Sequence, residues 1–177
     1  AGANGVLLVT PIQQTLTNTT NAPILVTFTI TPVGPAPASC AGTPVTETVL
    51  VNPTPSGTIT ASAPSVCNGT PVTLTFAATA GTGNFDIIVN GTTYPNVVSG
   101  SVFATVSPAM TTTYTLSSIT DKGVTPNCSN SSPGSSVTVT VNPRPTATIS
   151  GTATNCNGGS TNVSLRFTRT VPITYSI

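Results

Sequence analysis

Histidine and tryptophan are absent from the chain, and only 4% of its 177 residues are charged. The lack of histidine removes the side chain that most often acts as a general base near neutral pH. No serine or threonine has a nearby lysine or histidine suited to activate it. The carboxylates Glu47, Asp86 and Asp121 are interpreted as solvated or turn-capping groups, with Asp121 capping the turn before Lys122, and not as the facing pair of a glycosidase. We therefore expect no catalytic site.

The scarcity of charge also limits the classes of partner. The cations are scattered along the chain, at Lys122, Arg144, Arg166 and Arg169. Nucleic-acid binding needs clustered cations that replace phosphate counterions, so it is not expected. No apolar run approaches the length of a membrane-spanning helix, which argues against a membrane span in this segment.

No cofactor or metal site is predicted. Without histidine or a Cys-x-x-Cys pair, zinc lacks enough soft ligands. Calcium usually needs several carboxylates, and a carbonyl-rich site that includes Asp121 is the remaining alternative. The glycines of Gly81-Thr82-Gly83 lie between strands, with no helix following, so they do not predict a phosphate loop.

Threonine and valine dominate the composition, and apolar residues alternate with threonines along many short segments. β-Branched residues fit a pleated surface, and a period of two is typical of strands with one buried face. Asn90-Gly91 predicts a type I′ hairpin. Inward-facing sets include Val72, Leu74 and Phe76, and also Val102, Ala104 and Val106. The fold class predicted is all-β, as two-layer antiparallel sandwiches, with seven strands near 57–61, 71–78, 85–89, 92–97, 102–107, 112–120 and 136–142.

A tripeptide, Val51-Asn52-Pro53, returns as Val141-Asn142-Pro143. The sequence that follows is also repeated. Cys67-Asn68-Gly69 precedes one alternating strand, and Cys156-Asn157-Gly158 precedes another after two inserted residues. Cys40 and the segment before the first tripeptide match Cys128 and the segment before the second. A repeat of this period indicates tandem modules. We expect the end of one module at 1–53, a complete module at 54–143 and the start of a third at 144–177.

Each junction holds two prolines within three residues, at Pro53 and Pro55 and again at Pro143 and Pro145. Proline fixes φ and pushes the preceding residue toward an extended conformation. The junctions are therefore predicted to be short, semi-rigid connectors that hold the modules end to end.

Several of these motifs resemble a known class of repeats. The Cys-Asn-Gly turn with its alternating strand, the segment Ser107 to Leu116, Asp121, a late cysteine and the final Val-Thr-Val-Asn-Pro are similar to PKD-like and Ig-like repeats of large secreted surface proteins of the Bacteroidota. Leu16 to Pro32 resembles a sister PKD-like type. Such arrays occur in cell-surface adhesins, including gliding-motility adhesins exported by the type IX secretion system.

The resemblance implies an extracellular or outer-surface location and a non-catalytic, adhesive or stalk-like role. Partners would then be surface polysaccharide or another cell-surface component, neighbouring modules, and the secretion or anchoring machinery. The alternative is a carbohydrate-binding accessory module of a secreted multidomain enzyme. That role favours an exposed aromatic platform, for which Tyr94 beside the Asn90-Gly91 hairpin is the candidate.

Four cysteines at repeating positions, Cys40, Cys67, Cys128 and Cys156, suggest disulfides in an oxidising compartment. The resemblance implies two cysteines per module, hence a Cys67–Cys128 bond. In an Ig-like sandwich, however, Cys67 would precede the second strand and Cys128 would follow the sixth, which runs the same way. The two would then lie at opposite poles. The second alternative, in which each cysteine bonds a neighbouring module, stays open.

The low charge raises a question about the sheet edges. Edge strands normally carry lysine or proline, which block the addition of a further strand. The blockers available here are prolines, at Pro71, Pro95, Pro108 and Pro133. If these do not suffice, we expect lateral assembly into filaments.

Overall fold

The structure, a computed structural model, describes residues 13–152 and 154–168. Every regular element in this part of the chain is a β-strand, which confirms the all-β prediction. Within the same residues, no helix is long and apolar enough to cross a bilayer. The strands are β1 (Ile24–Ile30), β2 (Val45–Val51), β3 (Ser56–Ala61), β4 (Ser65–Cys67), β5 (Val72–Ala80), β6 (Phe85–Val89), β7 (Thr92–Val97), β8 (Ser101–Val106), β9 (Thr112–Asp121), β10 (Cys128–Asn130), β11 (Ser136–Asn142), β12 (Ala147–Ser150) and β13 (Ser164–Phe167).

The middle of the chain forms two sheets that share one core. A three-stranded sheet has the order β3-β5-β8, and a six-stranded sheet has the order β4-β11-β9-β6-β7, with β10 also paired to β9. All of these pairs are antiparallel except β4 with β11. We call β3 to β11 the central unit. Its two layers alternate inward apolar and outward hydroxyl side chains, as a two-layer β-structure requires.

The core of the central unit is small and apolar. Ile59 and Phe76 come from the three-stranded sheet, and the facing sheet contributes a larger set: Phe85, Ile87, Val89, Val97, Leu116 and Ile119. The rings of Phe76 and Phe85 meet edge to face, with their centroids 5.5 Å apart. This contact joins the two layers at the centre of the unit.

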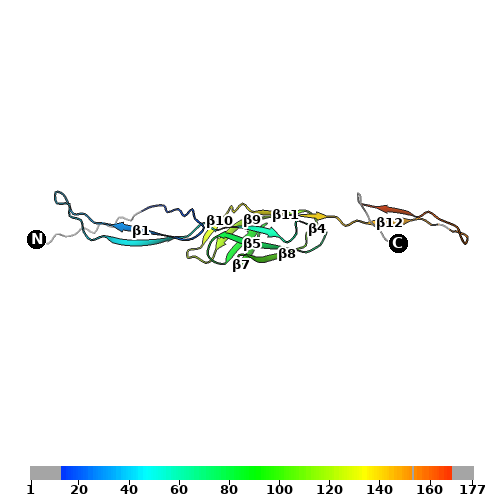
Figure 1. Ribbon diagram of the computed structural model, residues 1–177, viewed down its shortest axis with the longest axis horizontal. Helices are drawn as coiled ribbons and strands as arrows, with labels where there is room; N and C mark the ends of the chain where they lie inside the picture. The colour runs from blue at the N-terminus through cyan, green and yellow to red at the C-terminus, as the bar shows by residue number, and fades with distance from the viewer. Residues whose placement is uncertain (1–12, 153, 169–177) are drawn as a thin grey trace.

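Two separate hairpins flank the central unit. β1 pairs only with β2, and β12 pairs only with β13, among the described strands. No sheet in the described residues combines strands from both sides of either Val-Asn-Pro tripeptide. Figure 1 shows the β1–β2 hairpin, the central unit and the β12–β13 hairpin in a row along the longest axis, with β1–β2 at one end and β12–β13 at the other.

The β1–β2 hairpin repeats the strand register of β9 and β11. Phe28 lies opposite Glu47, as Tyr114 lies opposite Val137. The next pair on the same face also corresponds, because Val26 lies opposite Val49 and Thr112 lies opposite Val139. The hairpin therefore has the pairing of the last two long strands of the central unit.

The β12–β13 hairpin corresponds in the same way to β3 and β5. Ile149 pairs with Leu165, and Ile59 pairs with Phe76. Leu165 follows Cys156 by the same number of residues as Phe76 follows Cys67. The sequence comparison placed two inserted residues before this strand because it matched Leu165 with Leu74. The structure matches Leu165 with Phe76 instead, so no insertion is required.

The first connector is seated on the central unit. Pro53 and Pro55 are fully buried, and Asn130 Nδ2 donates to the carbonyl oxygen of Pro55 at 3.0 Å. On the hairpin side, Asn18 Nδ2 donates to the carbonyl oxygen of Val51 at 2.7 Å. A proline pair held on both sides in this way restricts bending between the hairpin and the central unit.

The second connector is held where it leaves the central unit. Asn142 Nδ2 donates to Ser65 Oγ at 2.6 Å, and Arg144 Nε donates to the carbonyl oxygen of Asn68 at 3.2 Å. Pro143 and Pro145 are exposed, in contrast to the buried prolines of the first connector. The start of each connector is thus held by hydrogen bonds, whereas only the prolines of the first connector are buried.

The seven expected strands are all present, with ends shifted by at most two residues. The prediction missed two three-residue strands, β4 and β10, because segments this short carry no visible alternation. Asn90 and Gly91 both have positive φ, 48° and 79°, which confirms the expected hairpin turn.

The expected inward position of Val102 is wrong. Val102 is 54% exposed, and the neighbouring Phe103 points toward the core instead. The pairing explains the change, because Leu74 lies opposite Ala104 while Thr75 lies opposite Val102. One step on β5 thus matches two steps on β8. Such a bulge interrupts the alternation of side chains and redirects the residue at its centre.

Candidate functional site

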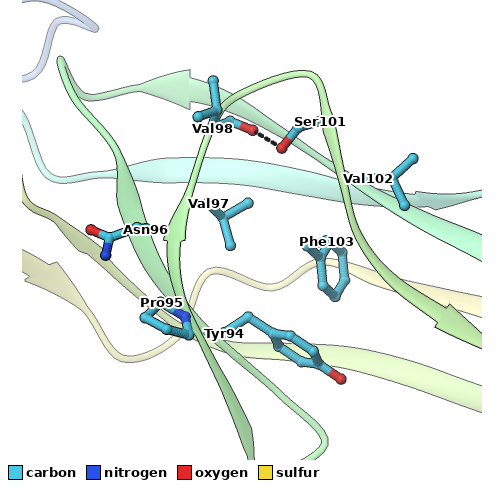
Figure 2. A pocket seen from close by; sticks show the side chains of 8 residues that line it. All are labelled: Tyr94, Pro95, Asn96, Val97, Val98, Ser101, Val102 and Phe103. Carbon is cyan, nitrogen blue, oxygen red and sulfur yellow. Dashed lines mark hydrogen bonds between the residues drawn. The ribbon is translucent and has the colours of Figure 1, made fainter.

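A pocket opens where the edge strands β7 and β8 of the two sheets approach each other. Its volume is about 290 Å³. Figure 2 shows its lining, which comes from these two strands and the loop between them: Tyr94, Pro95, Asn96, Val97, Val98, Ser101, Val102 and Phe103. No charged side chain contributes to the lining. The pocket can therefore bind a neutral ligand by apolar contact and hydrogen bonds.

Both strands that form the pocket are bulged. Between the pairs Phe85–Val97 and Ile87–Tyr94, β7 takes three steps while β6 takes two. Asn96, in the extra stretch, has a φ of 54°, and its N–H donates to Asp86 Oδ1 at 2.9 Å. Bulges and Pro95 interrupt the regular row of backbone groups on this edge. The edge is thus blocked by backbone shape instead of lysine.

An aromatic pair spans the pocket. The rings of Tyr94 and Phe103 meet edge to face with their centroids 4.9 Å apart (Figure 2). Sequence reasoning expected an exposed Tyr94, whereas the structure places it half-buried at the margin of the core. Phe103 was missed, because regular alternation assigned it to the outer face. A bulge has no strong sequence signal here, so only the three-dimensional pairing reveals this partner.

Tyr114 lies beside the same margin, on β9. Burial raises the pKa of its hydroxyl, and the nearby Tyr94 raises this pKa further. The hydroxyl therefore stays protonated at neutral pH and acts as a neutral hydrogen-bonding group. The ring of Tyr114 packs against the core of the central unit.

Asp121 has a structural position. It is 1% exposed, and its carboxylate accepts the N–H of Thr82 and the N–H of Gly123, each at 2.8 Å. This confirms the predicted cap of the turn at Lys122-Gly123. Because backbone donors occupy both oxygens, the alternative calcium site has no support in this geometry.

The other two carboxylates do not face Asp121: Asp86 is paired with Thr120 on the neighbouring strand, so its side chain lies on the other face of the sheet. Asp86 Oδ2 is 3.5 Å from Lys122 Nζ in a partly exposed ion pair, and Glu47 lies on the flanking hairpin β1–β2. Within residues 13–152 and 154–168, no three cysteine or acidic side chains gather as a metal site would require. The described carboxylates thus form neither a pair for acid–base chemistry nor a cation site.

All four cysteines are free thiols in the structure, so the expected disulfides are not present. Cys67 lies level with Asn142, at the end of the central unit where the chain leaves. Cys128 lies level with Asp121, at the opposite end. The ten residues of β9 separate these ends by roughly 30 Å, while a disulfide needs Cα atoms within about 7 Å.

The second alternative, in which cysteines bond neighbouring modules, stays a prediction. Cys40 lies in the β1–β2 connection, where its carbonyl oxygen accepts the N–H of Gly34 at 2.8 Å. Cys156 lies in the β12–β13 connection, and it is exposed like Cys40 and Cys67. Every cysteine is thus at an end of its hairpin or unit.

Comparison of the chain with protein-family models, with curated proteins and with solved structures gives no match.

Proposed function

We propose that this chain is a non-catalytic repeat segment of a long adhesin at the cell surface or outside the cell. In this proposal, 1–53 ends a PKD-like module, 54–143 is a complete Ig-like or PKD-like module, and 144–177 begins a third. The modules act as a stalk and as a multivalent contact surface. Type IX secretion, surface anchoring and a part in gliding motility belong to the same proposal, through the family resemblance alone.

The strand order of the central unit supports an Ig-like module. Its first, third and sixth strands form one sheet, and the remaining strands form the other, with a shared core between them. The first segment of the central unit contributes β3 to one sheet and β4 to the other. This division is compatible with an Ig-like Greek-key sandwich.

The repeated register is the observation that carries the proposal. β1–β2 reproduces the pairing of β9 and β11, and β12–β13 reproduces that of β3 and β5, in sheets that do not cross the connectors. This repetition of the pairing supports a tandem array of one structural unit, the organisation of a repeat protein. The buried prolines of the first connector support a stalk.

The surface of the central unit supports weak, repeated contact. Its outward positions carry hydroxyl groups, such as the facing pair Thr113 and Thr138, whose Oγ1 atoms lie 2.8 Å apart. Charge is scarce throughout the chain. Neutral hydroxyl faces suit a neutral polysaccharide partner, and many copies compensate for the low affinity of each one.

Adhesion can be tested with particles that display the chain either densely or sparsely. We expect dense particles to be retained on immobilised neutral polysaccharides and sparse particles to be released, since retention depends on the number of contacts. Retention is measured across a polysaccharide panel under buffer flow, with bare particles as the control. If dense and bare particles are released alike across the panel, the adhesive part of the proposal is wrong.

The stalk can be tested in solution. Small-angle scattering should give an elongated chain, and replacing Pro53 and Pro55 with glycine should shorten its maximum dimension and broaden the distribution of distances, because glycine removes the fixed φ. The double replacement of Pro126 and Pro133, which lie in loops of the central unit, is the matched control and should leave the dimension unchanged. An equally extended glycine variant would show that the prolines do not stiffen this joint.

A second candidate is a carbohydrate-binding accessory module, favoured by the aromatic pair in the β7–β8 pocket. If it is correct, Tyr94→Ala should reduce retention of the chain on a glycan column at least about tenfold, since one ring contact can contribute on the order of 1.4 kcal/mol. Met110→Ala is the control, because Met110 is 73% exposed and lies outside the pocket. Unchanged retention of the Tyr94 variant would remove this candidate.

A further inference from the structure

The tripeptide Asn-Gly-Thr occurs at two turns of the central unit. Asn68-Gly69-Thr70 follows β4, and Asn90-Gly91-Thr92 leads from β6 into β7. An asparagine before glycine can modify itself, because the glycine nitrogen, which no side chain shields, can attack the carbonyl carbon of the asparagine side chain. The two turns therefore offer the same reaction in the same local sequence, and their surroundings decide where it is fast.

The two glycines are equally accessible. Gly69 has a φ of 76° and Gly91 has a φ of 79°, and a Cβ added to either would meet no atom within 4 Å. Asn68 and Asn90 are both exposed. Since steric access and exposure are matched, a difference in reactivity between the two turns must come from hydrogen bonds and charge.

The side chain of Asn90 is held away from the reaction. Its Nδ2 donates to the carbonyl oxygen of Thr113 at 3.0 Å, and its Oδ1 accepts the N–H of Thr115 at 2.8 Å. Attack by the following nitrogen requires this amide to leave β9 and to break both hydrogen bonds. The two bonds therefore slow the reaction at Asn90.

Asn68 has the opposite arrangement. Within the described residues its side-chain amide forms no hydrogen bond, whereas its backbone carbonyl oxygen accepts the Nε–H of Arg144 at 3.2 Å. The Gly69 N–H makes a long hydrogen bond, 3.4 Å to the carbonyl oxygen of Pro108. The carbon that is attacked is thus free to move, and the attacking nitrogen is only weakly held.

The position of Arg144 favours the chemical step itself. The Gly69 nitrogen becomes a nucleophile when it loses its proton, and the negative charge that results is shared with the carbonyl oxygen of Asn68. The guanidinium bound to this oxygen stabilises that charge, as a donor placed at a developing oxyanion does in an enzyme. Among the described residues, no lysine or arginine side chain forms a hydrogen bond or an ion pair with Asn90.

We propose that Asn68 converts itself to aspartate or to the β-linked isomer of aspartate, with Gly69 as the nucleophile and Arg144 as the catalytic cation. Hydroxide removes the Gly69 N–H proton, and the nitrogen forms a bond to Cγ of Asn68. The Cγ–Nδ2 bond then breaks, and the amide nitrogen takes a proton from water and leaves as ammonia, which regenerates hydroxide. Water opens the cyclic imide at either carbonyl, so the sum consumes water, releases ammonia and involves no oxidation.

Either product places a carboxylate on residue 68, beside the guanidinium of Arg144. Arg144 belongs to the second connector, so the new ion pair ties this connector more firmly to the end of the central unit. This consequence, unlike the reaction, rests on the proposed stalk function. Exposed ion pairs have small effects, so the joint tightens slightly, and irreversibly, as the protein ages.

The reaction is tested on the full 177-residue chain at mildly alkaline pH. Samples are digested with pepsin at acid pH, and mass spectrometry gives the fraction of acid at each position over time. We expect modification of Asn68 to be faster than that of Asn90 by about tenfold or more, because two hydrogen bonds protect Asn90. In urea the two rates should become equal, since the tripeptides are identical.

Two variants separate catalysis by Arg144 from simple exposure of Asn68. Arg144→Gln should slow the modification of Asn68 by about threefold, as expected for the loss of an exposed charged donor. Arg166→Gln is the matched control, because it removes an exposed cation on β13 and should leave this rate unchanged. In urea neither variant should alter the rate.

The effect on the connector has its own measurement. Asn68→Asp introduces the carboxylate directly, and it should slow the exchange of the Arg144 Nε–H with solvent by about twofold, as followed by NMR. Unchanged exchange in this variant would overturn the tightening of the connector.

The remaining outcomes distinguish this inference from the function proposed above. Equal rates at Asn68 and Asn90 in the folded chain overturn self-modification and leave the stalk standing, because the stalk does not depend on Asn68. An unchanged rate in Arg144→Gln overturns the catalytic part of Arg144. A failure of the stalk appears instead in the scattering of the variant that lacks Pro53 and Pro55, and it leaves the rate at Asn68 as it was.

Discussion

Replacing Asp121 with alanine is expected to destabilise the central unit by about 3 kcal/mol, because the N–H groups of Thr82 and Gly123 lose a buried charged acceptor. Hydrogen bonds to a charged group are stronger than neutral ones, and unpaired buried donors carry a further cost. For a domain of this size, the loss corresponds to a fall in Tm of roughly 15 °C. Urea unfolding followed by circular dichroism measures the change.

Asp86→Ala is the matched control for this variant. Asp86 is also a carboxylate that accepts a backbone N–H, from Asn96, but its side chain is 32% exposed and its partner Lys122 is more exposed still. Exposed ion pairs contribute little, so the control should lose less than about 1 kcal/mol. Equal losses in the two variants would contradict the role assigned to the buried cap.

A larger loss, about 4 kcal/mol, is expected for Phe76→Ala. Phe76 is fully buried and its ring joins the two sheets through Phe85. Truncation removes the transfer free energy of the ring and leaves a cavity that the surrounding strands fill only in part. Since small domains have a total stability of about 5–15 kcal/mol, this variant should be largely unfolded well below the unfolding temperature of the unchanged chain.

Phe76→Leu keeps part of the apolar volume and should fold with a smaller loss, of about 1–2 kcal/mol. Val102→Ala is the control on the surface. Val102 is 54% exposed because of the bulge in β8, so its truncation should change stability by less than about 0.5 kcal/mol. A loss at Val102 comparable to that at Phe76 would mean that Val102 faces inward, as regular alternation had predicted.

The long strands could be predicted from the sequence because local chemistry determines them. Alternation of apolar residues and threonines placed β5, β9 and β11, and the Asn-Gly pair placed the turn between β6 and β7. The cap formed by Asp121 was also visible, since an aspartate before Lys122-Gly123 can accept the N–H two residues later. In each case the residues that determine the element lie within a few positions of it in the sequence.

The pocket could not be predicted, because it depends on pairing between distant strands. The extra residues in β7 and β8 shift the register against β6 and β5, and this shift turns Phe103 toward Tyr94. The sequence of one chain also does not indicate which segment packs on a given face of a sheet. Strand β4 could not be predicted for a related reason. Its three residues form a strand only through their pairing with the distant β11.

The parallel pairing of β4 with β11 determines how the central unit would respond to a pull on the two ends of the chain. The polypeptide enters at one pole and leaves at the other, so tension draws these two neighbouring strands past each other along their length. Their hydrogen bonds, including the one from Thr140 N–H to the carbonyl oxygen of Pro64, are then loaded together in shear and do not open one at a time. Such a unit resists extension until several bonds break at once.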